Sequence, residues 1–109
     1  AKETSEEITR MLVKVMDEAI ASGQAKLEHF SVAVKTGTAQ VADSTTGGYY
    51  EDRHTHSFVG YFPAYDPKFI VLLYAVNPKD VQYAATTWSK PFMDITKFLL
   101  NYYEVPPDR

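Results

Sequence analysis

The run from Phe69 to Val76 is the feature that most limits the folds open to this chain of 109 residues. Every position in the run is apolar, and β-branched and aromatic residues predominate. A strand with no polar side needs cover on both faces of its sheet. Asn77-Pro78 ends the strand, because proline cannot donate a hydrogen bond to a ladder. The sequence therefore predicts a sheet whose second face needs more cover than this chain's own helices supply.

Two further strands precede this run, and the first of them has one apolar face. The alternation from Phe30 to Val34 puts Phe30, Val32 and Val34 on one side. The second strand is predicted from His56 to Phe62, where Gly60 at mid-strand indicates a close approach by another element. Residues 41–55 are rich in glycine and small polar side chains, so we predict a long hairpin connection there.

Apolar residues recur at helical spacing near both ends of the chain. Thr4 and Glu7 have the spacing of a capping box, which predicts a helix from Ser5 to Ala21 that ends at the next glycine. A second helix is predicted from Phe92 to Tyr103, with Pro91 in its first turn. Both helices have one apolar stripe, so each is expected to cover part of a sheet.

The order helix, strand, strand, strand, helix predicts an α+β fold, an antiparallel sheet flanked by helices. We expect the two helices to pack side by side on one face of that sheet. A loop over residues 80–87 is predicted before the second helix. Pro106-Pro107 is predicted to end the ordered structure, and the polar tail is expected to be a natural carboxyl terminus.

Composition narrows the choice of partners. Hydrophobic residues make up 45% of the chain and charged residues 23%, which is typical of a globular protein. A net charge of -3 without a basic cluster argues against nucleic acid as a partner. No cysteine is present, which excludes disulfides and zinc-thiolate sites. His54 and His56 share a strand face without a third ligand, so we expect exposed histidines rather than a metal site, and no cofactor is predicted.

The stretch from Val32 to Gln40 changes abruptly from an apolar run to Lys35, Thr36, Gly37 and Thr38. Thr36 and Thr38 share a face of an extended strand, with their hydroxyls about 7 Å apart. The lysine supplies positive charge, and the two hydroxyls supply donors. A glycine between them lets a ligand approach the main chain. This segment is therefore a candidate anion-binding edge.

Three motifs follow one another in order along the chain. They are Lys-Thr-Gly-Thr-Ala-Gln from Lys35, Ser-Phe-Val-Gly from Ser57, and Pro91-Phe92 before a helix that leads to Val105-Pro106-Pro107. Together they resemble the last third of a penicillin-binding transpeptidase domain, most closely of the class B group. The resemblance covers the chain from Thr4 onward. It implies that residues 1–109 are the carboxyl-terminal portion of a domain with a transpeptidase/β-lactamase-like fold.

The resemblance also implies a chemistry. In that family a serine of a Ser-x-x-Lys motif attacks the D-alanyl-D-alanine end of a peptidoglycan stem peptide, and β-lactam antibiotics acylate the same serine. Lys35 would hold the charge of the active site, and the hydroxyls of Thr36 and Thr38 would bind the terminal carboxylate. The backbone N–H of Thr38 would be one of two oxyanion donors, and Gly37 would let the substrate lie along the strand. The implied location is the extracytoplasmic face of the bacterial cell membrane, with the anchor outside this chain.

The sequence departs from the complete family pattern. No serine is followed three residues later by lysine, and no Ser-x-Asn motif occurs. Val34 stands where the family usually has a glycine. We therefore expect one wall of an active site, inactive alone, whose nucleophile comes from a missing amino-terminal part of the same enzyme. The alternatives are a β-lactamase or β-lactam sensor domain of the same fold, and a non-catalytic α+β interaction module.

Overall fold

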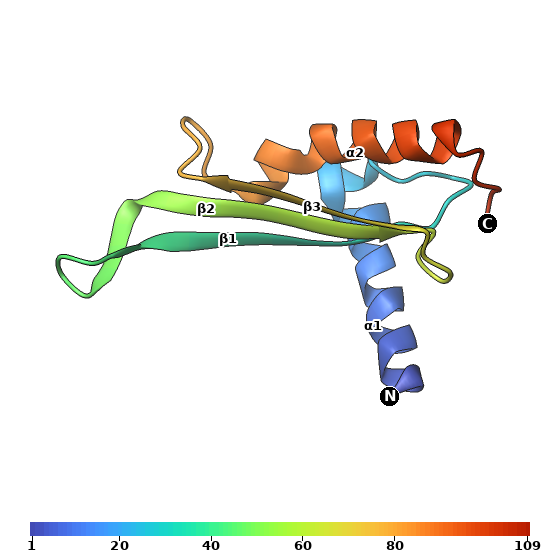
Figure 1. The fold of residues 1–109 in the computed structure, drawn as a ribbon, viewed down its shortest axis with the longest axis horizontal. Helices are drawn as coiled ribbons and strands as arrows, with labels where there is room; N and C mark the ends of the chain where they lie inside the picture. Colours follow the sequence, from blue (N-terminus) through green and yellow to red (C-terminus); the bar gives the residue numbers. More distant parts are fainter.

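The computed structural model describes all residues from 1 to 109 and has the predicted element order. Two helices, α1 (Lys2–Lys14) and α2 (Ala84–Tyr102), flank three strands. The strands are β1 (Ala33–Asp43), β2 (Gly48–Phe62) and β3 (Phe69–Val76), and they form one antiparallel sheet in the order β1-β2-β3 (Figure 1). The α+β prediction is therefore confirmed, and β1 and β3 are the two edges of the sheet. No helix is both long enough and apolar enough to cross a membrane.

The predicted long connection between the first two strands is wrong. The strands continue to Asp43 and from Gly48, so only a turn at residues 44–47 joins them. Gly47 adopts a left-handed φ of 76°, and the Asp43 carboxylate accepts the Thr45 N–H at 2.9 Å. Both features are typical of a tight turn. The hairpin projects beyond the rest of the sheet (Figure 1). Because neither face of this part packs on a core, its sequence lacks the apolar alternation from which strands are predicted.

The second helix begins earlier than predicted. It starts at Ala84, so residues 84–87 are helical and Pro91 lies inside the helix rather than in its first turn. The first-turn N–H of Ala84 donates to the hydroxyl of Thr38 on β1 at 2.9 Å. A helix start needs an acceptor for such a group. Because that acceptor comes from a distant strand, local sequence signals do not reveal it.

The main core lies between the sheet and α2. The largest buried side chains there are Phe58, Phe62 and Phe92, and the ring centroids of Phe58 and Phe92 are 4.6 Å apart. A Cβ atom at Gly60 would lie 2.2 Å from the Phe92 ring. This contact confirms that the glycine marks a close approach. The predicted apolar face is also confirmed, because Val34 is buried in the same core.

The first helix differs from the prediction in its start and its position. It begins at Lys2 without a side-chain cap, so Thr4 lies inside the helix and the predicted capping box is wrong. A π-helical turn (Val15–Ala19) and a 3-10 turn (Ile20–Gly23) follow, and Gly23 has a φ of 84°. The right-handed helix has already ended before that glycine, because Ile20 is extended and Ala21 and Ser22 also have positive φ, so the predicted stop at Gly23 comes a few residues too late.

The two helices do not lie side by side on one face, contrary to expectation. α2 runs along one face, whereas α1 crosses the end of the sheet and its amino terminus points away from it (Figure 1). The Thr9 hydroxyl lies 2.8 Å from the Tyr61 hydroxyl, and Val13 packs with Ala33. Ala33 and Tyr61 are paired residues on the face opposite the Gly60 contact with α2. α1 therefore reaches the second face only at the end of the sheet.

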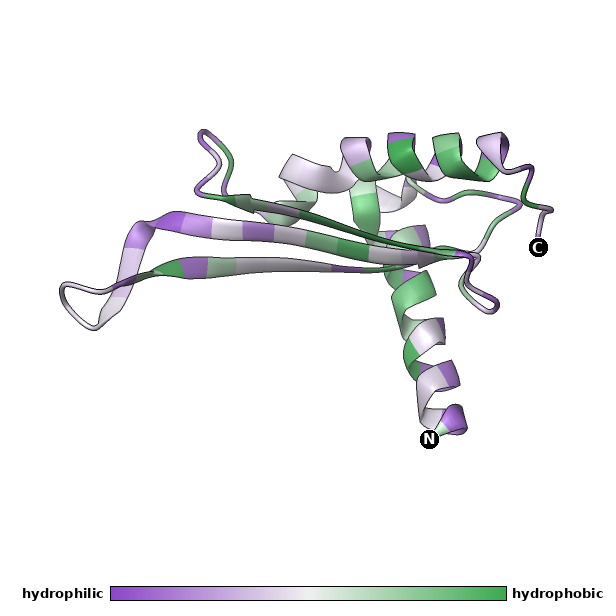
Figure 2. Cartoon of the chain, viewed as in Figure 1, coloured by the Kyte–Doolittle hydropathy of each residue, from purple (hydrophilic) through white to green (hydrophobic).

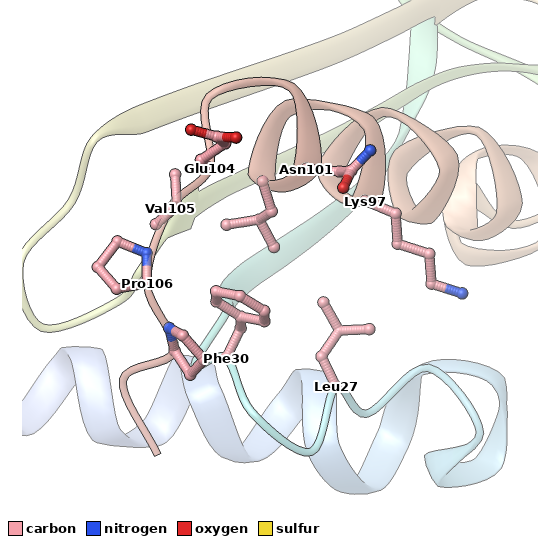
Figure 3. Close-up of a pocket in the computed structure, with 9 residues that line it drawn as sticks. Leu27, Phe30, Lys97, Asn101, Glu104, Val105 and Pro106 are labelled. Carbon is pink, nitrogen blue, oxygen red and sulfur yellow. The ribbon is translucent and has the colours of Figure 1, made fainter.

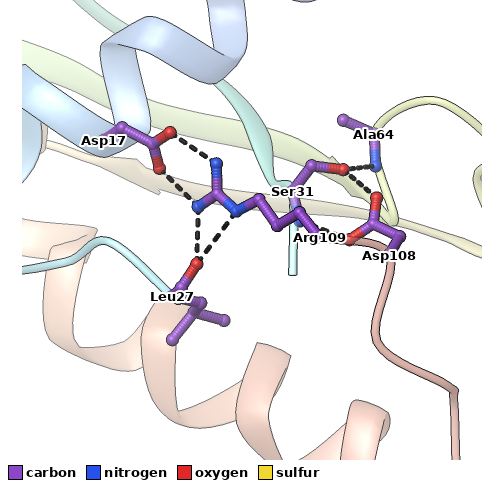
Figure 4. A network of polar contacts seen from close by, with 6 residues as sticks. All are labelled: Asp17, Leu27, Ser31, Ala64, Asp108 and Arg109. Atoms are coloured by element: carbon purple, nitrogen blue, oxygen red, sulfur yellow. Dashed lines mark hydrogen bonds and ion pairs between the residues drawn. The ribbon is translucent and has the colours of Figure 1, made fainter. Parts of the chain in front are cut away.

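The carboxyl-terminal tail is ordered, so the prediction that Pro106-Pro107 ends the ordered structure is wrong. The Arg109 guanidinium donates to both carboxylate oxygens of Asp17, at 2.6 and 2.8 Å (Figure 4). This hydrogen bonding raises the pKa of Arg109 further above its ordinary value. The Asp108 carboxylate accepts the backbone N–H of Ser31 at 2.7 Å and also bonds the Ser31 hydroxyl. These contacts fasten the tail to the segment that leads into β1.

Candidate active-site edge

The predicted site residues lie together on β1, an edge strand of the sheet. Lys35 is exposed, and its ammonium group donates to the carbonyl of Thr36 at 2.6 Å. Thr36 pairs with Phe58 and Thr38 pairs with His56, so both threonines lie on the α2 side of the sheet. Lys35 lies on the other side. The predicted shared face of the two threonines is confirmed, and the segment offers a cation and two hydroxyls around one strand edge.

The close packing at Gly37 comes from within the sheet. A Cβ atom at this position would lie 2.5 Å from the hydroxyl oxygen of Ser57, which is paired with Gly37 on β2. Contacts this short do not occur, so any larger residue would displace the Ser57 side chain. The serine of the Ser-Phe-Val-Gly motif and the glycine of the Lys-Thr-Gly motif thus fit against each other.

Behind Thr38 lies a polar cluster that the sequence did not predict. His56 is fully buried, whereas we expected an exposed histidine. Its Nδ1 lies 2.7 Å from the Thr87 hydroxyl, and its Nε2 lies 2.9 Å from the carbonyl oxygen of Gln82. Trp88 donates its indole N–H to the His56 carbonyl at 3.1 Å. The expectation failed because burial of a polar ring requires hydrogen-bond partners, and these come from the start of α2, 26 to 32 residues away.

No group of three His, Cys, Asp or Glu side chains is arranged to hold a metal ion. A cavity of about 470 Å³ lies between the tail, α2 and the segment before β1 (Figure 3). Leu27, Phe30 and Leu100 line it, with Lys97 and Glu104 among its polar residues. None of residues 35–38 lines this or any other cavity of the chain. The Lys-Thr-Gly segment therefore lies on an open strand edge and not inside a cavity of this chain.

Comparison with known proteins agrees with this fold. The family described as penicillin binding protein transpeptidase domain matches residues 1–97. The peptidoglycan D,D-transpeptidase FtsI homolog of Nephroselmis olivacea is 41% identical over 81 residues, which cover 73% of this chain and 11% of that protein. The penicillin-binding protein 3 transpeptidase domain of Burkholderia pseudomallei is 25% identical, with a TM-score of 0.78 over 100% of this chain and 33% of that one.

Penicillin-binding protein 3 of Mycobacterium tuberculosis, solved in complex with ampicillin, has the same fold, with a TM-score of 0.80 at 24% identity. The match covers 98% of this chain and 25% of that one. The chain belongs to the penicillin-binding protein transpeptidase domain family. It spans less than a fifth of the length of the FtsI homolog. The family assignment confirms the resemblance drawn from the motifs, and the alternatives of a β-lactamase and of an interaction module are not favoured.

Proposed function

We propose that residues 1–109 are the carboxyl-terminal portion of a class B type peptidoglycan D,D-transpeptidase and form one wall of its active site. The observation that supports this most directly is the position of Lys35, Thr36, Gly37 and Thr38 on an unpaired strand edge, in a chain of this family. A substrate can lie along such an edge, because the outward backbone groups are free to pair. The complete protein would cross-link peptidoglycan and react with β-lactams.

Each residue of the wall has a proposed role. The serine nucleophile belongs to the amino-terminal part of the same enzyme. Lys35 supplies positive charge to the hydrogen-bond network of the active site. Thr36 and Thr38 donate hydroxyl hydrogen bonds to the carboxylate of the D-alanyl-D-alanine stem peptide or of a β-lactam. The Thr38 N–H is one oxyanion donor. Gly37 keeps the strand edge narrow, since its own face is occupied by Ser57. We place this chemistry at the extracytoplasmic face of the bacterial membrane.

The isolated chain should not form a covalent penicillin adduct, because it contains no serine with a lysine at the required spacing. The test is to incubate the isolated chain and the complete protein with a fluorescent penicillin and to separate them on a denaturing gel. We expect label only on the complete protein. A labelled band at the mass of the isolated chain would contradict the division of the site between two segments.

The role of Thr38 is tested by the substitution Thr38→Val in the complete protein. Losing one hydrogen bond to a carboxylate should slow acylation about tenfold to a hundredfold. The variant also removes the acceptor for the Ala84 N–H, so stability should fall by about 0.5–2 kcal/mol. Rates are therefore measured per folded active site, and Thr38→Ser, which keeps the hydroxyl, is the matched control. Equal rates for Thr38→Val and the unmodified protein would exclude this role.

A further inference from the structure

Thr38 is held from behind by the first turn of α2. Its hydroxyl oxygen accepts the N–H of Ala84 at 2.9 Å. A hydroxyl that accepts a backbone hydrogen bond still has its own proton to donate in another direction. The amino terminus of a helix carries partial positive charge, which strengthens a hydroxyl as a donor. This contact therefore leaves the proton of the Thr38 hydroxyl available for a second partner, and the position of Ala84 restricts the directions in which that proton can point.

The position of Ala84 is fixed by His56, the residue paired with Thr38 across the strands. The carbonyl of Gln82 can only accept, so the His56 Nε2 carries a proton and donates to it at 2.9 Å. The His56 Nδ1 and the Thr87 hydroxyl form the second hydrogen bond of the ring at 2.7 Å, and the same hydroxyl lies 3.4 Å from the carbonyl oxygen of Tyr83. Gln82 and Thr87 lie on either side of Ala84. One buried ring thus bonds the chain before and after the residue that contacts Thr38.

The His56 ring is enclosed by the protein, and the backbone of the same residue is also bonded by the helix. His56 is fully buried, and the carbonyl of the same residue accepts the indole N–H of Trp88 at 3.1 Å. Because the ring is buried, water does not replace its protein partners. A replacement without hydrogen-bonding atoms would leave the Gln82 carbonyl without its side-chain partner and would remove one of the two partners of the Thr87 hydroxyl. Neither Gln82 nor Thr87 belongs to the wall formed by residues 35–38.

We propose that His56 is a positioning residue for recognition of the substrate carboxylate. It holds residues 82–87 so that the Ala84 N–H fixes the orientation of the Thr38 hydroxyl. This proposal rests on the proposed function, in which Thr38 binds the carboxylate of a stem peptide or β-lactam. The proposal states that His56 acts through Thr38. Replacing His56 should therefore lower the acylation rate with ligands that carry the carboxylate and leave the rate nearly unchanged with ligands in which that carboxylate is esterified.

The experiment compares benzylpenicillin with its methyl ester as acylating agents of the complete protein. We expect His56→Phe to lower the second-order acylation rate with benzylpenicillin about threefold to thirtyfold, and the rate with the ester by less than about twofold. A general structural defect would lower both rates equally. Equal losses for the two agents, or no loss for either, would overturn the proposal. If the unmodified protein is not acylated at all, the proposed function itself fails, and this inference fails with it.

A second pair of variants decides the question if His56→Phe does not fold. Thr87→Val removes the hydroxyl that bonds Nδ1, and Thr87→Ser keeps it. We expect the valine variant to show the same selective loss of benzylpenicillin reactivity and the serine variant to restore it. Thr86→Val, at an exposed neighbouring position, is the matched control and should leave both rates unchanged. A loss that the serine variant does not restore would overturn the proposal.

The coupling to Thr38 is tested by combining the substitutions. If His56 acts through Thr38, then adding His56→Phe to Thr38→Val should lower the benzylpenicillin rate no further than Thr38→Val alone. Effects that multiply independently would show that His56 acts by another route and would contradict the proposal.

Discussion

The two faces of the sheet differ sharply in how completely this chain covers them. On the α2 side, Phe58, Phe62 and Phe92 are fully buried. On the other side, Ile70 and Leu72 remain 73% and 65% exposed, and Tyr74 and Val76 are also exposed. Figure 2 shows most of β3 as hydrophobic. One strand thus contributes to a closed core on one side and leaves an apolar surface bare on the other.

This difference indicates which part of the fold the chain supplies by itself. Large contiguous apolar surfaces are rare on monomeric soluble proteins and mark contact with another polypeptide or segment. Burying one large apolar side chain contributes about 1.5–3 kcal/mol, so the open face represents a substantial unused contribution to stability. Under the proposed function, the amino-terminal part of the transpeptidase domain would cover this face. The covered face should then be stable by its own packing, and the open face should not.

The largest effect is expected on the covered face. Phe92→Ala in the complete protein should lower the free energy of unfolding by about 3–5 kcal/mol, because the ring fills the space above Gly60 and contacts both core phenylalanines. Phe92→Leu, the control, should cost clearly less because it keeps most of the volume. Denaturant unfolding measures both values. A cost for Phe92→Ala below that of the leucine variant would show that the two faces do not differ in this way.

The open face is tested by amide hydrogen exchange of β3 in the isolated chain and in the complete protein. We expect the protection of residues 69–76 to be lower in the isolated chain by a factor of at least about ten, because one face and one edge of this strand lack cover there. The amides of β2 near Phe58 should differ less, since they lie in the middle of the sheet. Equal, strong protection of β3 in both proteins would show that the chain closes its own core.

Sequence reasoning succeeded where a pattern is local and repeats. Alternation identified the buried face of β1, and the mid-strand Gly60 correctly indicated a close approach, which the structure shows to be the contact with α2. The ordered motifs that begin at Lys35, Ser57 and Pro91 together indicated the family, which the family match confirms, whereas the candidate wall from Lys35 to Thr38 stays a prediction. These features depend on neighbours in the sequence, or on backbone geometry that a single residue type reveals.

The predictions failed where a distant partner decides the structure. The start of α2 depends on Thr38, 46 residues before it, and the burial of His56 depends on Gln82 and Thr87. The tail is fixed by Asp17, 92 residues before Arg109. No local propensity encodes such contacts, so the polar cluster behind the candidate site could be found only in the fold.

Substitutions of Arg109 in the carboxyl-terminal tail test whether the tail stabilises only the segment that leads into β1 or also β3. Arg109→Ala should destabilise the chain by about 1 kcal/mol, because a bidentate pair that is only 27% and 16% exposed is lost. Arg109→Lys should recover part of this, since a lysine keeps the charge but cannot form the two parallel bonds. The loss should appear as faster exchange near Ser31 and leave β3 unchanged. Faster exchange in β3 would show that the tail also supports the open side.

The smallest effect is expected at the projecting hairpin, where neither face has a core. The Asp43 carboxylate accepts the Thr45 N–H, and this hydrogen bond lowers its pKa below the ordinary aspartate value. The contribution to stability is therefore fully present above that ordinary value and is lost as the pH falls through the lower pKa of the folded state.

Because the turn is local, a carbon-13 NMR titration should give the same depressed pKa of Asp43 in the isolated chain and in the complete protein. Asp43→Asn, which keeps an acceptor, should remove this pH dependence while preserving the turn. A pKa at the ordinary value in the isolated chain would mean that the hairpin, like the open face, depends on the missing part.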